Sequence, residues 1–357
     1  MSAKPHITEL AHAQYPCFWG IDVGGTNIKF GLVDNLGQTL AFESIPTQEP
    51  LGPQAAVDRL SKELVLLESR LGAGLRERIL GIGLGTPGSM DLPAGKLVEP
   101  PNLPNWWHFP IRDALSEATR LPVSFVNDAN AAAYGEFWLG AGRNHRSMIL
   151  LTLGTGVGGG VIVEGQLVNG VNSFGSECGH IIVDSADDAR LCVWGGGRGH
   201  LEAYASASAV VQRTRELLRS GGSKTNSSVL LGMLGGNDSE LTAKKVFEAA
   251  LVQDALALEI VDETARWLGI GITTLVHTLD PGLVVLGGAM DFGGLQSPVG
   301  VRFIERIRAE FQRRTFENVF LGTTIDFASL GGDAGYLGAA GYARKEQLLD
   351  RSSSESN

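Results

Sequence analysis

The pattern of hydrophobic residues changes along the chain between helical spacing and short continuous runs. Apolar residues recur every three to four positions over 54–71, which is typical of one buried face of a helix. Short apolar runs at 79–84, 123–126 and 283–286 predict buried strands, and a long helix is predicted over about 252–278. Strands that alternate with helices of this length predict an α/β fold with largely parallel crossovers.

Two stretches of the chain begin in the same way. FWGIDVGGTNIKFGLVD starts at Phe18 and ILLTLGTGVGGGVIVEG starts at Ile149. Both read as a strand, a turn rich in glycine and threonine, and a second strand. Each closes with a glycine, an apolar run and an acid. This weak internal repetition lies where a duplicated fold would place it.

The repetition predicts two domains. We expect an N-terminal α/β domain over 18–126, completed by a C-terminal helix over 335–349, and a larger C-terminal α/β domain over 127–334. No low-complexity linker separates the halves, so a cleft between tightly connected domains is the expected ligand site. Residues 1–16 and 351–357 are expected to be frayed tails.

Charge and composition argue against several classes of function. The net charge is −10, whereas a protein that binds the phosphate backbone of nucleic acids normally carries a basic face. Three cysteines make no disulfide framework, and the N-terminal segment lacks the apolar core of a secretory signal. The longest uncharged run, 147–163, is too short to span a membrane. We therefore expect a cytoplasmic protein with no nucleic-acid or membrane partner.

The two glycine-rich turns are candidate phosphate loops, because glycines let several backbone N–H groups face one anion. In Asp22-Val-Gly-Gly-Thr26 the carboxylate at a strand end could also hold Mg²⁺, and Leu153-Gly-Thr-Gly156 offers a second loop. The alternative is a pair of tight hairpins whose glycines only relieve strain. Neither turn matches GxxxxGK[ST], and no strand–turn–helix unit supports a dinucleotide-binding motif.

A third element is the segment Phe125-Val-Asn-Asp-Ala-Asn-Ala-Ala-Ala133. Asn127 or Asp128 ends a strand and opens a helix, so either residue could simply be a helix N-cap. A carboxylate at this position is also well placed to accept a proton from a substrate hydroxyl. Taken alone, the segment leaves both interpretations open.

Several segments follow one another in an order known from a single family. They are Asp22-Val-Gly-Gly-Thr26, Gly85-Thr-Pro-Gly88, Pro101-Asn-Leu103, Asn127-Asp-Ala-Asn130, Leu153-Gly-Thr-Gly156, Gly175-Ser-Glu-Cys-Gly-His180 and 281–288. Over about residues 18–345 the chain resembles the ROK family, which contains repressors, sugar-kinase open reading frames and sugar kinases such as bacterial glucokinases. The resemblance implies the actin-like, ribonuclease-H-like ATPase fold, in which two α/β domains close over nucleotide and sugar.

The resemblance also implies roles for individual residues, carried over position by position. Asp128 would be the catalytic base, and Asp22 would hold Mg²⁺. The residues implied to bind nucleotide are Asp22, Gly24, Gly25, Thr26, Gly154, Thr155, Gly156, Gly287 and Gly288. Those implied to bind the sugar are Gly88, Asn102, Asn127, Asp128, Glu177, His180 and Glu202.

One segment departs from the family pattern. The family usually combines a histidine with CxCGxxGCxE in a Cys₃His zinc site, but here Trp194 and His200 replace two of the cysteines. The alternative to a zinc site is a metal-free loop packed around Trp194, with His180 serving the sugar alone. The zinc ligands that the sequence still offers are His180, Cys192 and His200, with Asp184, Asp187 or Asp188 as a fourth.

The resemblance favours an enzyme, a kinase of the glucokinase type that uses ATP and Mg²⁺ to form glucose 6-phosphate. Kinases for N-acetylmannosamine, N-acetylglucosamine, fructose and allose share the scaffold, and polyphosphate is an alternative donor, so both substrates stay open. A sugar-responsive repressor is disfavoured, because only 21 residues precede Asp22, too few for a helix-turn-helix module. Nothing indicates a sugar-binding protein without catalysis, because Asp128 and both loops are present. A homodimer is the family expectation.

Overall fold

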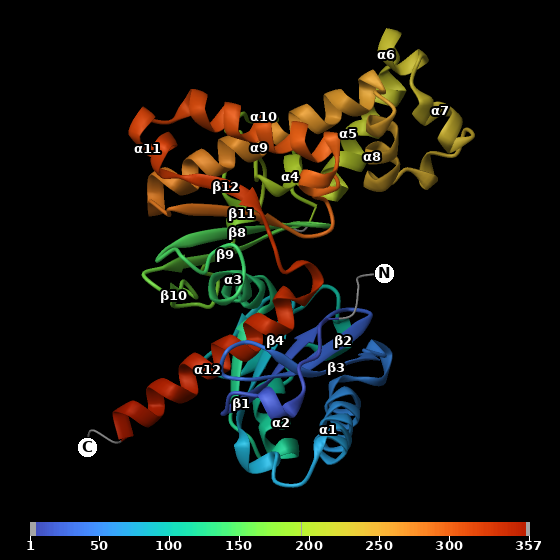
Figure 1. Ribbon diagram of the computed structural model, residues 1–357. Helices are drawn as coiled ribbons and strands as arrows, with labels where there is room; N and C mark the ends of the chain where they lie inside the picture. The colour runs from blue at the N-terminus through green and yellow to red at the C-terminus, as the bar shows by residue number, and fades with distance from the viewer. Residues whose placement is uncertain (1–4, 194, 355–357) are drawn as a thin grey trace.

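The computed structural model describes residues 5–193 and 195–354 and has two lobes, each built on a five-stranded sheet (Figure 1). The strand order is β3-β2-β1-β4-β7 in the first sheet and β10-β9-β8-β11-β12 in the second. Each sheet contains three consecutive antiparallel strands, and two further strands run parallel to the first of them. The repeated start that the sequence indicates is therefore the start of a repeated sheet topology.

The two sheets and a short hairpin account for the strands. The first sheet comprises β1 (Cys17–Val23), β2 (Asn27–Val33), β3 (Thr39–Pro46), β4 (Ile79–Thr86) and β7 (Val123–Asn127). The second comprises β8 (Met148–Leu153), β9 (Val157–Val163), β10 (Gln166–Leu167), β11 (Leu283–Gly287) and β12 (Thr324–Phe327). The hairpin pairs β5 (Met90–Asp91) with β6 (Lys96–Leu97).

The α-helices lie outside and between the sheets. They are α1 (Pro53–Leu71), α2 (Ile111–Thr119), α3 (Asp128–Trp138), α4 (Glu202–Ala205), α5 (Ala207–Ser220), α6 (Ser223–Asn226), α7 (Val229–Leu234), α8 (Ala243–Leu251), α9 (Ala255–Leu279), α10 (Pro298–Arg314), α11 (Glu317–Gly322) and α12 (Ala334–Ser354). None of the helices in the described ranges combines the length and apolar character that a membrane span requires.

Most elements predicted from hydrophobic spacing are present at the expected positions. The helix expected over 54–71 is α1, and the three predicted strands are β4, β7 and β11. The long helix α9 begins at Ala255, three residues later than predicted. Its start is fixed by Asp254, whose side chain accepts a hydrogen bond from the backbone N–H of Ala257 (2.9 Å), and α8 has ended just before it.

Two helices, α3 and α12, lie between the sheets (Figure 1). Helix α12 packs on β1 and β4, where a Cβ atom on Gly20 or Gly83 would overlap backbone atoms of the helix. Helix α3 packs against α12 and, on its other side, against β9. At the crossing of the two helices, a Cβ atom on Gly338 would overlap the carbonyl of Ala131. The inter-lobe layer is therefore built on close backbone approach through small residues.

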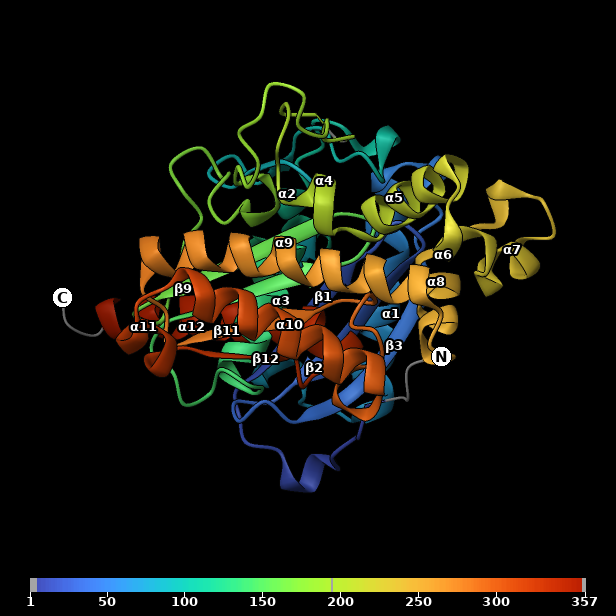
Figure 2. The same ribbon diagram turned by 90° about the horizontal axis from the view of Figure 1, so that it is seen from above.

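The outer faces of the sheets carry the main hydrophobic cores. In the first lobe, α1 and α2 cover a core that includes the fully buried side chains of Trp19, Leu64 and Trp106. In the second lobe, α9 and α10 lie across the sheet (Figure 2), and Phe303 and Phe311 of α10 are fully buried in the core. Each lobe thus buries its own core on the side away from the inter-lobe helices.

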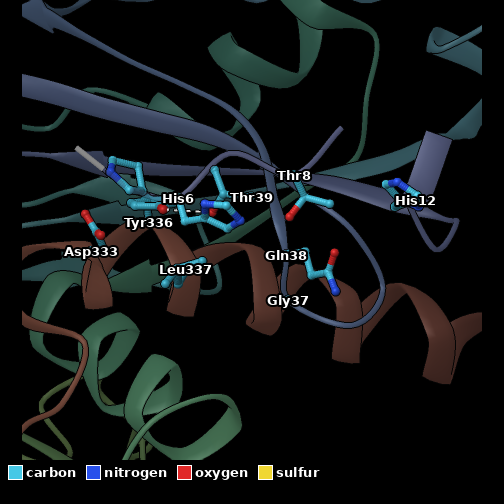
Figure 3. A pocket seen from close by; sticks show the side chains of 10 residues that line it. His6, Thr8, His12, Gly37, Gln38, Thr39, Asp333, Tyr336 and Leu337 are labelled. Carbon is cyan, nitrogen blue, oxygen red and sulfur yellow. Dashed lines mark hydrogen bonds between the residues drawn. The ribbon is translucent and has the colours of Figure 1, made fainter. Parts of the chain in front are cut away.

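The described part of the N-terminal segment, 5–16, contacts the first lobe. The N–H of Thr8 donates to the carbonyl of Thr39 (2.8 Å), and the N–H of Gln14 donates to the carboxylate of Asp34 (2.9 Å). These bonds hold the segment against the first lobe. Beneath the segment lies an open cavity of about 580 Å³ (Figure 3). Its polar lining includes His6, His12, Gln38, Thr39, Asp333 and Tyr336.

Candidate active site

Asp128 lies where the first sheet passes into the inter-lobe layer, because β7 ends at Asn127 and α3 begins at Asp128. The side chain of Asn127 accepts hydrogen bonds from the N–H groups of Ala129 (2.9 Å) and Asn130 (3.4 Å), so Asn127 is the helix N-cap. The Asp128 carboxylate accepts a hydrogen bond from the N–H of Ala129 (2.8 Å). The capping role therefore does not require Asp128.

The pKa of Asp128 is raised from 3.8 to about 7. Burial is the largest cause, and the negative charges of Asp22 and Glu177 add to it, while the hydrogen bond from Ala129 opposes it. Two carboxylates from distant parts of the sequence thus act on a third, Asp128. A carboxyl group that titrates near neutrality is suited to accept a proton from a hydroxyl group.

Asp22 lies near the end of β1, opposite Lys29 on the antiparallel strand β2. Burial raises the pKa of Asp22, and the charge of Lys29 opposes this rise. The carboxylate also lies against Gly335 in the first turn of α12, where a Cβ atom would be 2.5 Å from its Oδ2. The structure thus places Asp22 at the N-terminus of α12 and Asp128 at the N-terminus of α3.

The first glycine-rich turn joins β1 to β2. The N–H of Gly24 donates to the carbonyl of Asn27 (2.9 Å), and the hydroxyl of Thr47 donates to the carbonyl of Gly24 (2.6 Å). Gly25 and Thr26 at the tip are exposed. Asn102 lies beside this tip, because a Cβ atom placed on Gly25 would be 3.6 Å from its side chain.

The second glycine-rich turn joins β8 to β9 and is held by the start of α4 and α5. The N–H of Ala207 donates to the carbonyl of Gly154 (2.8 Å), and the carboxylate of Glu202 lies against Gly156. A Cβ atom on Gly154 would meet nothing within 4 Å, so its backbone faces open space. A cavity of about 530 Å³ adjoins this turn, with Thr155 and Glu202 in its lining.

Gly287 and Gly288 lie beside the second turn, at the end of β11. The backbone of Gly288 has φ +93°, and a Cβ atom there would overlap the backbone of Leu153. The N–H of Met290 donates to the carbonyl of Leu153 (3.0 Å), which fixes the two segments together. The residues implied to contact the nucleotide in the second lobe therefore form one continuous backbone surface.

The residues predicted to bind sugar come from both lobes. In the first lobe, the side-chain amide of Asn127 donates to the carbonyl of Gly88 (3.4 Å). In the second lobe, burial raises the pKa of Glu177; the charge of His180 opposes the rise, and that of Glu202 adds to it. The Oε2 atom of Glu202, which is buried, accepts a hydrogen bond from the N–H of Val157 (2.8 Å).

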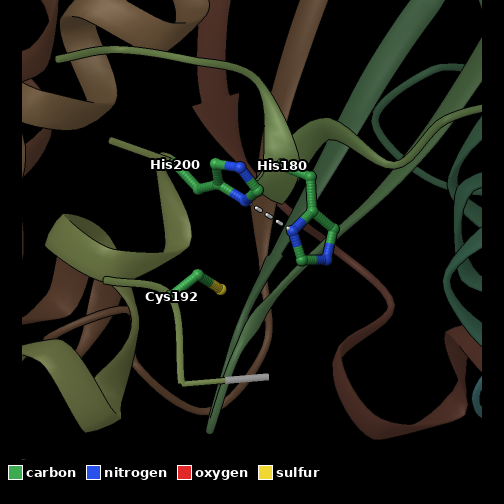
Figure 4. Close-up of side chains that lie close together, drawn as sticks. All are labelled: His180, Cys192 and His200. Atoms are coloured by element: carbon green, nitrogen blue, oxygen red, sulfur yellow. Dashed lines mark hydrogen bonds between the residues drawn. The ribbon is translucent and has the colours of Figure 1, made fainter. Parts of the chain in front are cut away.

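His180, Cys192 and His200 converge in the second lobe (Figure 4). Their ligand atoms all lie within 4.8 Å of one another, and the Nδ1 atoms of the two histidines are 2.9 Å apart. The Sγ atom of Cys192 donates to Oε1 of Glu202 (3.3 Å). Two imidazoles and a thiol at this spacing fit the donor set of a zinc ion.

The aspartates expected as a fourth zinc ligand do not belong to this cluster. The carboxylate of Asp184 accepts hydrogen bonds from the hydroxyl of Tyr204 (2.5 Å) and from the N–H of Ala186 (3.1 Å). Asp187 and Asp188 are exposed. These residues are close to the cluster in sequence, but the loop directs them elsewhere. Trp194, around which the alternative metal-free loop would pack, lies outside the described residues.

Sequence reasoning missed the turn that leads into α12. The Nζ atom of Lys29 donates to the carbonyl of Gly332 (2.9 Å) in this turn. Burial raises the pKa of the adjacent Asp333, and the charge of Lys29 opposes the rise. The sequence Gly331-Gly-Asp-Ala-Gly335 before a helix was the available signal, because glycines at a helix N-terminus are typical of anion-binding sites.

Comparisons with known proteins agree with this arrangement. The model of the ROK family matches residues 18–346. The glucokinase of Halalkalibacterium halodurans is 36% identical over 330 residues, which cover 92% of this chain and 94% of that protein. Xylose repressors are found among the more distant relatives.

Solved structures give the same result. The ROK hexokinase of Thermus thermophilus has a TM-score of 0.76 and 32% identity and covers 94% of this chain and 99% of its own. The ROK family glucokinase of Streptomyces griseus, solved with glucose and AMPPNP, has a TM-score of 0.70 and 32% identity and covers 92% and 99%. The predicted two-domain, actin-like ATPase fold is confirmed.

Proposed function

The chain belongs to the ROK family, and on that premise we propose that it transfers the terminal phosphoryl group of ATP to a hexose hydroxyl, converting glucose to glucose 6-phosphate. The observation that carries this proposal is the buried Asp128 carboxylate, which has a pKa raised to about 7 and is released from capping by Asn127. It lies between two lobes that each present a glycine-rich turn.

Asp128 acts as the general base in this proposal. Its ionised carboxylate orients the attacking hydroxyl and accepts the hydroxyl proton as the new O–P bond forms. In this proposal the sugar is held by side chains from both lobes, since carboxylate, imidazole and amide groups all hydrogen-bond hydroxyls. The proposed sugar-binding residues are Gly88, Asn102, Asn127, Glu177, His180 and Glu202.

The two turns bind the nucleotide in this proposal. Gly24, Gly25 and Thr26 from the first lobe and the second turn, 154–156, offer backbone N–H groups to phosphate oxygens. Gly287 and Gly288 let the adenosine approach the backbone closely. Asp22 would hold Mg²⁺, and its fit is supported by a buried carboxylate with a raised pKa, whose charge a cation would offset. The ion, when bound, neutralises charge on the phosphoryl oxygens.

A panel assay tests the proposal. ATP-dependent release of ADP is coupled to a reporter with glucose, mannose, fructose, allose, N-acetylglucosamine and N-acetylmannosamine as acceptors. In a parallel series polyphosphate replaces ATP, and formation of the sugar phosphate is measured directly. We expect the highest kcat/KM for glucose with ATP. A higher value for another hexose would correct the substrate, and no activity on any acceptor would contradict the kinase proposal itself.

We also propose that His180, Cys192 and His200 hold one structural zinc ion, which their mutual spacing supports. Elemental analysis of protein never exposed to chelator should find about one equivalent. The variant Cys192→Ser should lose most of it, because the thiolate is the soft ligand of the set. Less than about a tenth of an equivalent in the wild type would contradict the zinc proposal, without bearing on kinase activity.

A further inference from the structure

The carboxylate of Glu136 joins the two segments of chain that pass between the lobes. Glu136 lies two turns along α3 from Asp128 and is fully buried. Its Oε1 atom accepts hydrogen bonds from the N–H groups of Ser329 (2.9 Å) and Leu330 (2.7 Å). Its Oε2 atom accepts from the Ser329 hydroxyl (3.0 Å) and from the N–H of Ala141 (2.9 Å).

These four donors satisfy the Glu136 carboxylate without a cation. Within residues 5–193 and 195–354, no lysine, arginine or histidine forms an ion pair with it. A buried carboxylate is retained only where hydrogen bonds replace its hydration, and each of these donors would otherwise be left unpaired. The hydrogen bonds of this carboxylate therefore hold residues 329–330 against α3.

The two segments that Glu136 joins each lead to one of the proposed catalytic carboxylates. Helix α3 carries Asp128 as its first residue. Ser329 and Leu330 lead into the turn 331–333 and the first turn of α12, where Gly335 lies against Asp22. Because Gly335 lies against Asp22, a displacement of the start of α12 relative to α3 would disturb Asp22 relative to Asp128.

We propose that Glu136 is a positioning residue that keeps Asp22 and Asp128 in their productive arrangement by fixing the turn before α12 to α3. The proposal rests on the kinase function proposed above. Catalysis depends on alignment to within a fraction of an ångström, and a displacement of about 1 Å by a distant mutation can lower the rate by about 10²-fold. Loss of this carboxylate is expected to act through such a displacement.

The variant Glu136→Gln tests the proposal in the full chain. Its amide nitrogen cannot accept a hydrogen bond, so at least one backbone N–H at 141 or 329–330 loses its acceptor. We expect kcat with glucose and ATP to fall by about tenfold or more. The KM for ATP should stay within about threefold, because the nucleotide surface of the second lobe is untouched. Calorimetric titration with AMPPNP gives the concentration of folded sites, to which kcat is normalised.

Amide hydrogen exchange provides a readout that does not depend on activity. In Glu136→Gln the amides of 329–335 should exchange about tenfold faster or more than in the wild type, because their anchor to α3 is weakened. This measurement decides the inference even if the wild type phosphorylates no hexose, an outcome that would contradict the proposed function instead.

Asp34 offers a matched control in the first lobe. It is fully buried and accepts hydrogen bonds from the N–H groups of Gln14, Leu36 and Gln38 at 2.8 to 2.9 Å. The variant Asp34→Asn makes the same chemical change without removing an acceptor of 329–330. It should lower the unfolding temperature but leave kcat and the exchange of 329–335 unchanged.

A milder variant covers the case in which Glu136→Gln does not fold. Ser329→Ala keeps the carboxylate and removes one of its four donors, and we expect about a threefold fall in kcat with faster exchange at 329–335. If the folded Glu136→Gln protein, or Ser329→Ala in its place, kept wild-type kcat and wild-type exchange at 329–335, Glu136 would be a stabilising residue only and the proposal would be overturned. An equal fall in kcat in Asp34→Asn would overturn it as well.

Discussion

The two ends of α3 carry buried carboxylates with opposite surroundings. Asp128 at the first residue is hydrogen-bonded, within the described chain, only by backbone N–H groups at the start of the helix, faces the negative charges of Asp22 and Glu177, and has a pKa raised to about 7. Glu136, two turns later, accepts four hydrogen bonds from groups fixed by the fold. Burial is common to both. The difference shows that a buried acid becomes a candidate base where its hydrogen-bonding capacity is left unfilled and its neighbours are acidic.

Of the changes considered, the substitution Asp128→Asn should lower activity the most. The amide is nearly isosteric and Asn127 supplies the cap, so the fold should stay intact. The amide cannot accept the hydroxyl proton, so kcat should fall by about 10²–10⁴-fold. Steady-state assays with glucose measure kcat, and the KM for ATP should change little, because the proposed nucleotide loops lie elsewhere.

Retention of activity by this variant would contradict the catalytic role that distinguishes Asp128 from Glu136. If Asp128→Asn keeps more than about a third of wild-type kcat on the best hexose, another group must be the base. Asp128 would then resemble Glu136 in having a structural role alone. Circular dichroism and AMPPNP titration of the variant confirm that the protein compared is folded.

The pH dependence of the wild type gives the next largest effect. Asp128 must be ionised to accept a proton, and its pKa is about 7 rather than the ordinary 3.8. The value of kcat/KM for glucose should therefore fall about tenfold for each pH unit below about 6 and level off above about 8. An acid limb near pH 4 would contradict the raised pKa of Asp128.

The stability of the folded protein should fall as pH rises, whereas its activity should rise. Because the pKa of Asp128 is raised on folding, the folded state favours the protonated form, and its contribution to stability is lost as pH rises from about 4 through about 7. The amide introduced by Asp128→Asn does not titrate. The unfolding temperature of this variant should match that of the wild type near pH 4 and exceed it by several degrees near pH 8. Calorimetry at both pH values measures this, and equal unfolding temperatures throughout would contradict it.

The smallest effect concerns the acidic neighbours of Asp128. The substitution Glu177→Gln removes one of the charges that raise the pKa of Asp128. The acid limb of kcat/KM should move to lower pH by a fraction of a unit. The position of the limb is the readout, since Glu177 is also proposed to bind sugar and its loss can lower the height of the profile. A shift to higher pH would contradict the charge argument.

Local sequence predicts one end of α3 better than the other. A strand followed by Asn127, Asp128 and an alanine-rich helix places a carboxylate at a helix start, and hydrophobic spacing finds the strands β4, β7 and β11 and the helices α1 and α9. The partner of Glu136 could not be inferred in this way, because Ser329 lies 193 residues away and is joined to it only through the fold. The prediction of a fourth zinc ligand was limited for a related reason. Asp184 is close to the cluster in sequence, but its carboxylate accepts a hydrogen bond from the hydroxyl of Tyr204 instead.

Helix α12 has a consequence for how the chain is made. It follows every other described helix in the sequence, yet it covers β1 and β4, and Phe18 and Val33 bury themselves against Tyr336 and Leu337. At about 5–20 residues per second, a translating ribosome leaves that face of the first lobe bare for on the order of ten seconds while the second lobe emerges. The sheet that is synthesised first is thus the last to have its inner face covered. Nascent chains stalled before residue 334 should be cleaved by protease in the first lobe, and protection there would show that it closes without α12.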